Sequence, residues 1–236
     1  MFQPSLPAHT AALMRSSEFE RDAASQTGDV HAGETRLAGL SPTLLQDLQR
    51  FDPAIGPGLD LLQVLAAALR HSRNLLVSLE LDYHIIPLTV RPRERVVHSP
   101  LTPAEFLALR LPDLRVLRVE APKPVDQSGQ EAAEGGASLN LLLWELALRG
   151  GRETLLPEIA GPAAYRVSPA ADLAVLALGG TMAAAVERLR RQVTPLRDIS
   201  AWPGFDRDRA IRMLNGLYLQ AALIISRSHP AALGGG

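Results

Sequence analysis

The chain lacks cysteine altogether, with none among its 236 residues. This absence excludes disulfide bonds, thiolate metal sites and cysteine nucleophiles. The sequence also has no apolar run long enough to span a bilayer, and no apolar signal-peptide stretch follows a basic start. We therefore expect a soluble cytoplasmic protein.

Lysine is almost as scarce, because Lys123 is the only lysine among 24 basic residues. Nucleotide-binding P-loops, kinases and Schiff-base enzymes each need a lysine in a defined setting, and Lys123 lies in the proline-rich stretch APKPVDQSG. The motifs HExxH, GxSxG and GxGxxG are absent as well. The sequence therefore predicts no catalytic residues, no cofactor and no metal. The dominance of arginine over lysine indicates a GC-rich bacterial genome.

Charge is nearly balanced, with a formal net charge of −1, so the chain as a whole does not attract nucleic acid or anionic lipid. Apolar residues make up 47% of it, enough for a sizeable core in two small domains. From composition we predict five parts: a disordered tail over 1–40, a small α+β domain over 41–120, a linker over 121–137, a helical domain over 138–229 and a second disordered tail over 230–236.

Hydrophobic patterns predict the elements of the α+β domain. Strands are expected over 75–81, 85–90, 95–98 and 114–120, and Pro87 favours an edge or a bulge for the second of them. A capping box with proline at the first helical position predicts a helix over 103–110. A further helix is expected over 59–71, with an apolar face of Leu61, Leu62, Leu65 and Leu69 opposite Asp60, Gln63 and Arg70.

The pattern of the second half of the chain predicts a mainly helical domain. Ser138 is placed to cap an unusually apolar helix that ends at Gly150, and 153–166 is expected to be irregular or a short helix. Ser168 and Pro169 then predict the start of another helix, which Gly179 and Gly180 would break before a helix over 181–192.

The C-terminal segment 194–227 carries clear boundary signals. Thr194 is placed to cap a short helix, which Pro203 and Gly204 would end, and Asp206 is placed to cap a second helix over 207–221. An apolar strand over 223–225 follows. Helix, tight turn, helix and strand make up the skeleton of a winged helix, which different proteins use to bind DNA or to bind protein.

The expected 207–221 helix meets only part of what a DNA-reading helix needs. Its face opposite the apolar stripe holds Asp208, Arg212, Asn215 and Leu219, and only the second and third of these suit base contacts. Arg188, Arg190 and Arg191 add a basic cluster on the preceding helix. The balanced overall charge favours an ordinary solvated face over a DNA reader.

Two further groups of residues are candidates for binding. Trp144 and Trp202 fit core packing or, if partly exposed, partner anchors. His84 and His98 lie near the ends of neighbouring strands, where a polar or metal site is conceivable, although ordinary hydrogen bonding explains them better. The candidate partner-binding residues are therefore Trp144, Trp202, Arg207, Arg212, Asn215 and Leu219, and the candidate polar site is His84 with His98.

The stretch from Leu59 to Trp144 resembles PATAN-type domains of bacterial signalling proteins. The resemblance lies in the helix residues Asp60, Leu61, Leu62 and Gln63, in the segment RERVVHSP with His98, and in LLLW over 141–144. The turn glycine of that family is replaced here by Pro92, Arg93 and Glu94, and the linker after Glu120 is longer. The resemblance implies a non-enzymatic adaptor that works with response regulators, pili or motility systems, and it brings no catalytic residues.

The leading prediction is thus a cytoplasmic bacterial α+β protein with a winged-helix-like C-terminal domain, which regulates by binding another protein. Two alternatives remain open: a winged-helix transcriptional regulator that binds DNA, and an enzyme of unrecognised type. Nucleic acid is the less favoured partner because of the charge balance, and insertion into a membrane is not expected.

Overall fold

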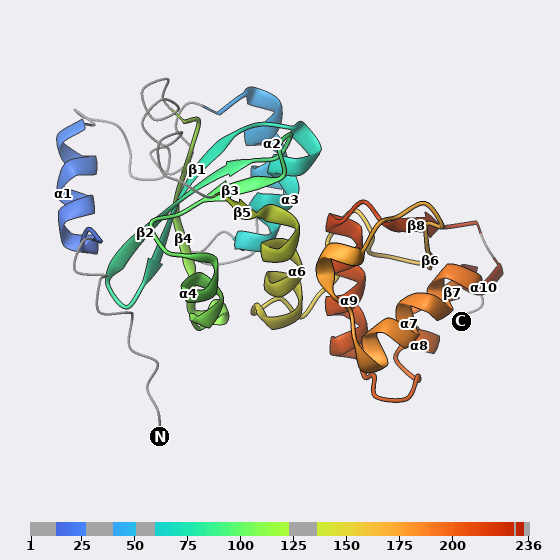
Figure 1. Ribbon diagram of the computed structural model, residues 1–236. Coiled ribbons are helices and arrows are strands. Elements are labelled where there is room, and N and C mark those ends of the chain that lie inside the picture. The colour runs from blue at the N-terminus through green and yellow to red at the C-terminus, as the bar shows by residue number, and fades with distance from the viewer. Residues whose placement is uncertain (1–12, 27–39, 51–59, 123–135, 229, 234–236) are drawn as a thin grey trace. The chain divides into compact units, whose positions relative to one another are not determined.

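The computed structural model describes residues 13–26, 40–50, 60–122, 136–228 and 230–233 (Figure 1). The chain divides into two compact units, Met1–Leu139 and Asn140–Gly236. Each unit contains helices and an antiparallel sheet, so the predicted mixture of α and β structure is confirmed. None of the helices described is both long and apolar enough to cross a membrane.

The first unit is built on a five-stranded antiparallel sheet in the order β4-β1-β2-β3-β5. Four of the strands match the predicted ones closely: β1 (Leu75–Leu81), β2 (His84–Arg91), β3 (Val96–His98) and β4 (Arg115–Glu120). The fifth, β5 (Ala137–Ser138), pairs with β3 at the edge of the sheet. The end of the expected linker over 121–137 is therefore part of the sheet, while Lys123 lies outside the described residues.

Pro87 was expected to mark β2 as an edge strand or a bulge, and this prediction is wrong for the strand as a whole, since β2 lies between β1 and β3 and pairs with β1 in a regular register. The reason for that expectation, the missing backbone N–H of Pro87, nevertheless agrees with the local pairing. Pro87 faces Ser78 of β1, whereas β3 pairs only with β2 residues 89–91. The amide of Ile85, two residues earlier on the same side, donates away from β1 to the carbonyl of Met14 at 2.9 Å. The missing N–H of Pro87 thus falls where β3 does not reach.

Short helices with clear caps pack around this sheet. In α3 (Leu61–His71) the side chain of Asp60 accepts from the Leu62 amide at 3.0 Å, and α4 (Pro103–Ala108) has the predicted capping box between Thr102 and Glu105. The helix α2 (Pro42–Arg50) packs against α3, and Asp47 accepts hydrogen bonds from Arg70. Gln63 was expected on an exposed face, yet it is buried, because α3 is covered on nearly all sides from Leu61 to Ala68.

The expected tail over 1–40 contains a helix, α1 (Ser16–Gln26), so the prediction of a structureless tail is wrong for residues 13–26. Two main-chain hydrogen bonds hold the start of this segment to the β1–β2 hairpin: Ser16 donates to the carbonyl of Tyr83 and Ile85 donates to that of Met14, both at 2.9 Å. The segment has little apolar periodicity. Its position is therefore set by these main-chain hydrogen bonds to the hairpin rather than by burial of an apolar face. Residues 1–12 and 27–39 lie outside the described residues.

The second unit has a three-stranded antiparallel sheet in the order β7-β6-β8, with helices before, between and after its strands. Its long helices are α6 (Leu139–Arg149), α7 (Gly180–Arg191) and α9 (Arg207–Leu219). The strands are β6 (Ala164–Val167), β7 (Thr194–Pro195) and β8 (Leu223–Ser226). Short helical turns complete it: η4 (Ala174–Leu176), α8 (Leu196–Ile199) and α10 (Pro230–Leu233).

Several boundaries of this unit differ from the predicted ones. The strand β6 begins within the stretch expected to be irregular, and Ser168 starts no helix. Thr194 lies in β7 instead of capping α8 with its side chain, because its backbone pairs with Tyr165 of β6. The cap at Asp206 is confirmed, since its side chain accepts from the Arg209 amide at 2.7 Å. The expected second tail includes α10, and residues 234–236 lie outside the description.

Candidate functional site

Three of the four residues on the candidate DNA-reading face of α9, all but the exposed Asp208, are buried or half-buried. Asn215 is completely buried: its side-chain oxygen accepts from the Leu156 amide at 2.8 Å, and its side-chain nitrogen donates to the Thr154 carbonyl at 3.0 Å. Leu219 is buried as well, and Arg212 donates to the Leu148 carbonyl at 3.2 Å. The exposed positions expected for Asn215 and Leu219 are therefore wrong. Helix periodicity showed two faces, but it did not show that α6 and the loop after it cover the more polar one.

Both tryptophans are buried, so neither is an exposed anchor. Trp144 of α6 is 3% exposed, and its indole ring lies against Gly216 of α9, which has no side chain to keep it away. Trp202 is 7% exposed, with the guanidinium of Arg188 4.6 Å from its ring centroid and the edge of Phe205 packed against it. A cation over an indole ring is a stabilising arrangement, so Arg188 also has a structural role here.

The arginines of the second unit mostly hold loops in place. Arg190, from the expected basic cluster, donates to three carbonyls of the loop after β6, those of Ser168, Pro169 and Ala171, at 3.0, 3.3 and 2.9 Å. Arg227 binds the carbonyls of Glu158 and Ala160 in the same manner. These guanidinium groups bind backbone oxygens of their own unit, some part-buried and some exposed, and so have a structural role. Of the residues proposed from the sequence, Arg207 is exposed, as is Arg191 of the basic cluster.

His84 and His98 do not form a joint site. His84 opposes Leu81 at the first residue of β2, whereas His98 opposes Thr89 near the other end of that strand. Five residues of strand separate the two positions, roughly 16 Å at about 3.3 Å per residue. A search of the described part of the chain finds no group of three His, Cys, Asp or Glu side chains that could hold a metal ion. The ring Nδ1 of His84 lies 2.8 Å from the Asp82 carbonyl oxygen, which is the ordinary hydrogen bonding expected for it.

An exposed tyrosine stands at the tip of the β1–β2 hairpin. Tyr83 is 81% exposed, the highest value among the exposed large apolar residues described. It shares a two-residue turn with Asp82, and the backbone φ angles of the two residues are +63° and +48°. Positive φ at both turn residues is the requirement of a type I′ turn, which favours Asn or Asp followed by Gly. A bulky side chain in the second position is strained.

Hydrogen bonds with Ser16 and Met14 hold this turn. The Ser16 amide donates to the Tyr83 carbonyl at 2.9 Å, and the Ser16 hydroxyl donates to Glu80 Oε1 at 2.6 Å. Met14, 41% exposed, lies beside the turn through its bond to Ile85. We call Met14, Asp82, Tyr83 and His84 the hairpin-tip site. It offers an aromatic and a thioether side chain on a backbone held by hydrogen bonds, an arrangement suited to binding rather than to acid–base chemistry.

Comparisons with protein-family models, curated proteins and solved structures find no match to the chain. Sequence reasoning missed the hairpin-tip site, although a signal for it was present. Two apolar strand patterns separated by Asp82, Tyr83 and His84 predict a tight hairpin, and a tyrosine in such a turn has no core to enter.

Proposed function

We propose that this protein is a non-catalytic regulatory adaptor that binds another protein through the hairpin-tip site. The observation that carries the proposal is the exposed Tyr83 in a left-handed turn position. An ordinary residue pays roughly 1–2 kcal/mol for that conformation. Strain of this kind clusters at functional sites, and tyrosine is one of the residues that dominate binding energy at protein interfaces.

The order of elements in the second unit supports a winged-helix-like assignment. The strand β7, the short helix α8, a turn, α9 and the strand β8 follow one another as in that skeleton. In this proposal the unit is a scaffold or a second protein-binding module, because most of the potential reading face of α9 packs against α6 and the loop after it. The resemblance to PATAN-type domains suggests a response regulator, or a pilus or motility component, as the partner in the cytoplasm.

The DNA-binding alternative predicts a different measurement. A DNA reader binds random duplex with a Kd of about 10⁻⁴ to 10⁻⁶ M at physiological salt, and its binding weakens steeply as salt rises. The exposed cations of α7 and α9, such as Arg191 and Arg207, are accompanied by Asp206 and Asp208. We expect weaker binding than that range in a fluorescence-anisotropy titration. Micromolar, salt-sensitive binding would support the regulator instead.

Affinity capture with matched variants tests the adaptor proposal. The wild-type protein, Tyr83→Gly and Ile224→Ser are each used to capture proteins from a lysate of the organism that encodes the chain. Ile224 is the control because it is 47% exposed on β8 in the other unit. We expect a signalling protein that is retained by the wild type and by Ile224→Ser but not by Tyr83→Gly. Identical protein sets on all three would contradict a role for the hairpin tip.

A further inference from the structure

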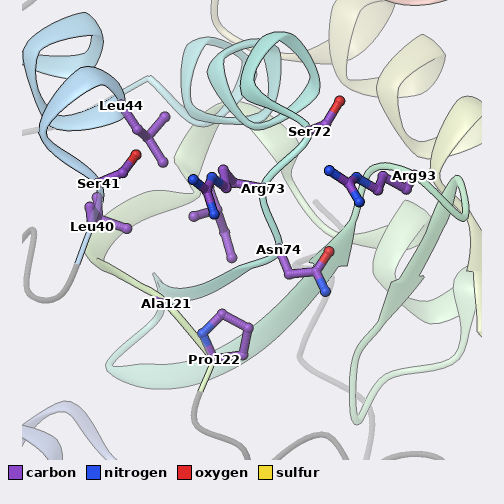
Figure 2. Close-up of a pocket in the computed structure, with 10 residues that line it drawn as sticks. Leu40, Ser41, Leu44, Ser72, Arg73, Asn74, Arg93, Ala121 and Pro122 are labelled. Atoms are coloured by element: carbon purple, nitrogen blue, oxygen red, sulfur yellow. The ribbon is translucent and has the colours of Figure 1, made fainter.

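A second candidate site lies at the end of the sheet opposite the hairpin tip. There the start of β1, the start of α2, the β2–β3 turn and the residues after β4 surround an open pocket of about 460 Å³ (Figure 2). This volume falls within the range of about 300–1,000 Å³ typical of small-molecule sites. The described residues that line it all belong to the first unit.

Two arginines give this pocket a positive charge. Arg73 follows α3 and Arg93 lies in the β2–β3 turn, and both side chains line the pocket. Figure 2 shows Arg93 reaching from its turn towards the side on which Ser72 and Arg73 lie. None of the described residues that line the pocket carries a carboxylate. Among the described walls of the pocket, therefore, nothing neutralises this charge.

Both guanidinium groups are without a hydrogen-bond or ion-pair partner among the described residues. Other arginines of the same unit are paired: Arg70 with Asp47 at 2.8 Å and Arg118 with Glu120 at 3.1 Å. The acidic neighbour of Arg93, Glu94, lies 3.5 Å from Arg91. These carboxylates thus pair with other arginines, and within the described part of the chain the N–H donors of Arg73 and Arg93 are left for a ligand.

The remaining walls combine polar donors with apolar surface. Ser41 and Ser72 supply hydroxyl groups and Asn74 supplies an amide, while Leu44 and Pro122 contribute apolar surface. The first turn of α2, which starts at Pro42, adds the positive end of a helix beside Ser41. A ligand that fits has a strongly anionic end and a body that tolerates apolar contact.

We infer that the pocket binds a small soluble phosphate monoester, with Arg73 and Arg93 holding the phosphate between them. A phosphate dianion has three terminal oxygens and two negative charges, which match two guanidinium groups that approach from different elements. A single carboxylate has one charge and would leave one arginine unpaired. The inference is independent of the adaptor proposal, because it uses a different end of the sheet and different residues.

Isothermal titration calorimetry with three probes tests the inference: adenosine monophosphate, inorganic phosphate and adenosine. The wild-type protein should bind the monophosphate best, inorganic phosphate more weakly and adenosine hardly at all. Arg73→Gln and Arg93→Gln should each weaken binding of the monophosphate about tenfold or more, since each removes charge-assisted hydrogen bonds. Arg115→Gln should bind as the wild type does, because Arg115 is an exposed arginine of the same sheet that lies away from the pocket.

Three results would overturn the inference. One is the lack of saturable binding of the monophosphate up to about 1 mM. Another is equal weakening by all three arginine variants, which would indicate general attraction by charge. The third is binding to vesicles that contain phosphatidic acid with none to the soluble monophosphate, which would assign the pocket to a membrane lipid. Circular dichroism of each variant confirms that the fold is retained, as expected for exposed side chains that bind no other described residue.

Discussion

Gly216 of α9 lies directly against the indole ring of Trp144 in α6, so that a Cβ at position 216 would come within 2.6 Å of Cε3 and 2.7 Å of Cζ3. Real Cβ atoms essentially never approach a neighbour so closely, and the tryptophan is buried and has little room to move. The absence of a side chain at this position therefore sets how closely the two helices pack.

Gly216→Ala should lower the free energy of unfolding by about 1–3 kcal/mol, the usual cost of overpacking a core. The direction of this change in unfolding free energy is informative. Without the close contact, alanine would stabilise the helix relative to glycine by about 1 kcal/mol. Urea unfolding of the wild type, of Gly216→Ala, of Trp144→Phe and of the variant with both substitutions forms a double-mutant cycle. The smaller ring should relieve part of the loss. Strictly additive losses would show that the two residues do not press on each other.

Asn215→Ala should destabilise the second unit by about 1–3 kcal/mol, because it leaves the Leu156 amide and the Thr154 carbonyl without their partner in a buried setting. Arg207→Ala, on the exposed first turn of the same helix, should change stability by no more than about 0.5 kcal/mol. Thermal or urea unfolding measures both. A stable Asn215→Ala variant would mean that the face of α9 assigned here as buried is open to solvent.

Arg190→Gln should loosen the loop after β6, since its guanidinium binds three carbonyls there. We expect faster hydrogen exchange at the amide of Ala171, which itself bonds to Ser168, together with a loss of about 1–3 kcal/mol in stability. Arg191→Gln is the matched control on an exposed neighbouring position. If the amides of both variants exchange at the rate of the wild type, the hydrogen bonds of Arg190 to these carbonyls do not stabilise the loop.

Stability should fall in alkaline solution because of Tyr165. Burial raises the pKa of its hydroxyl above the ordinary value of 10.0, and the charge of Arg227 opposes this by a smaller amount. The unfolded chain then releases this proton at a lower pH than the folded chain does. The contribution to stability is therefore full below pH 10 and declines as the pH rises above it. Urea unfolding from about pH 8 to pH 11 should show this slope in the wild type and a smaller slope in Tyr165→Phe.

The tight turn at Tyr83 allows the aromatic ring to be removed without loss of stability. Tyr83→Gly creates Asp-Gly, a favoured type I′ pair, and relief of left-handed strain offsets the extra chain entropy of glycine, about 0.5–1 kcal/mol. We expect a melting temperature equal to or above that of the wild type. Tyr83→Ala keeps the strained backbone and should melt below Tyr83→Gly. The reverse order would show that the turn carries no strain.

Local patterns predicted the elements of the first unit well, because its strands alternate or are uniformly apolar and its helices have capping residues such as Asp60 and Thr102. They failed where tertiary contacts decide. Residues 13–26 are held by hydrogen bonds to a strand edge, β6 is a four-residue strand in a stretch rich in turn residues, and Asn215 is buried because a loop needs its amide. The hairpin-tip site and the arginine pocket depend on exposure and on chain segments meeting in space, which one sequence does not display.

The most direct measurement of the central claim is the affinity of a captured partner for three purified forms of the protein. With wild-type protein, Tyr83→Gly and Ile224→Ser in the same calorimetric titration, we expect Tyr83→Gly to bind about thirtyfold more weakly or worse, as loss of an interface hot spot of at least about 2 kcal/mol implies. Ile224→Ser should bind within about twofold of the wild type. Equal affinity of Tyr83→Gly and the wild type, with both folded, would contradict the assignment of the hairpin tip as the partner-binding surface.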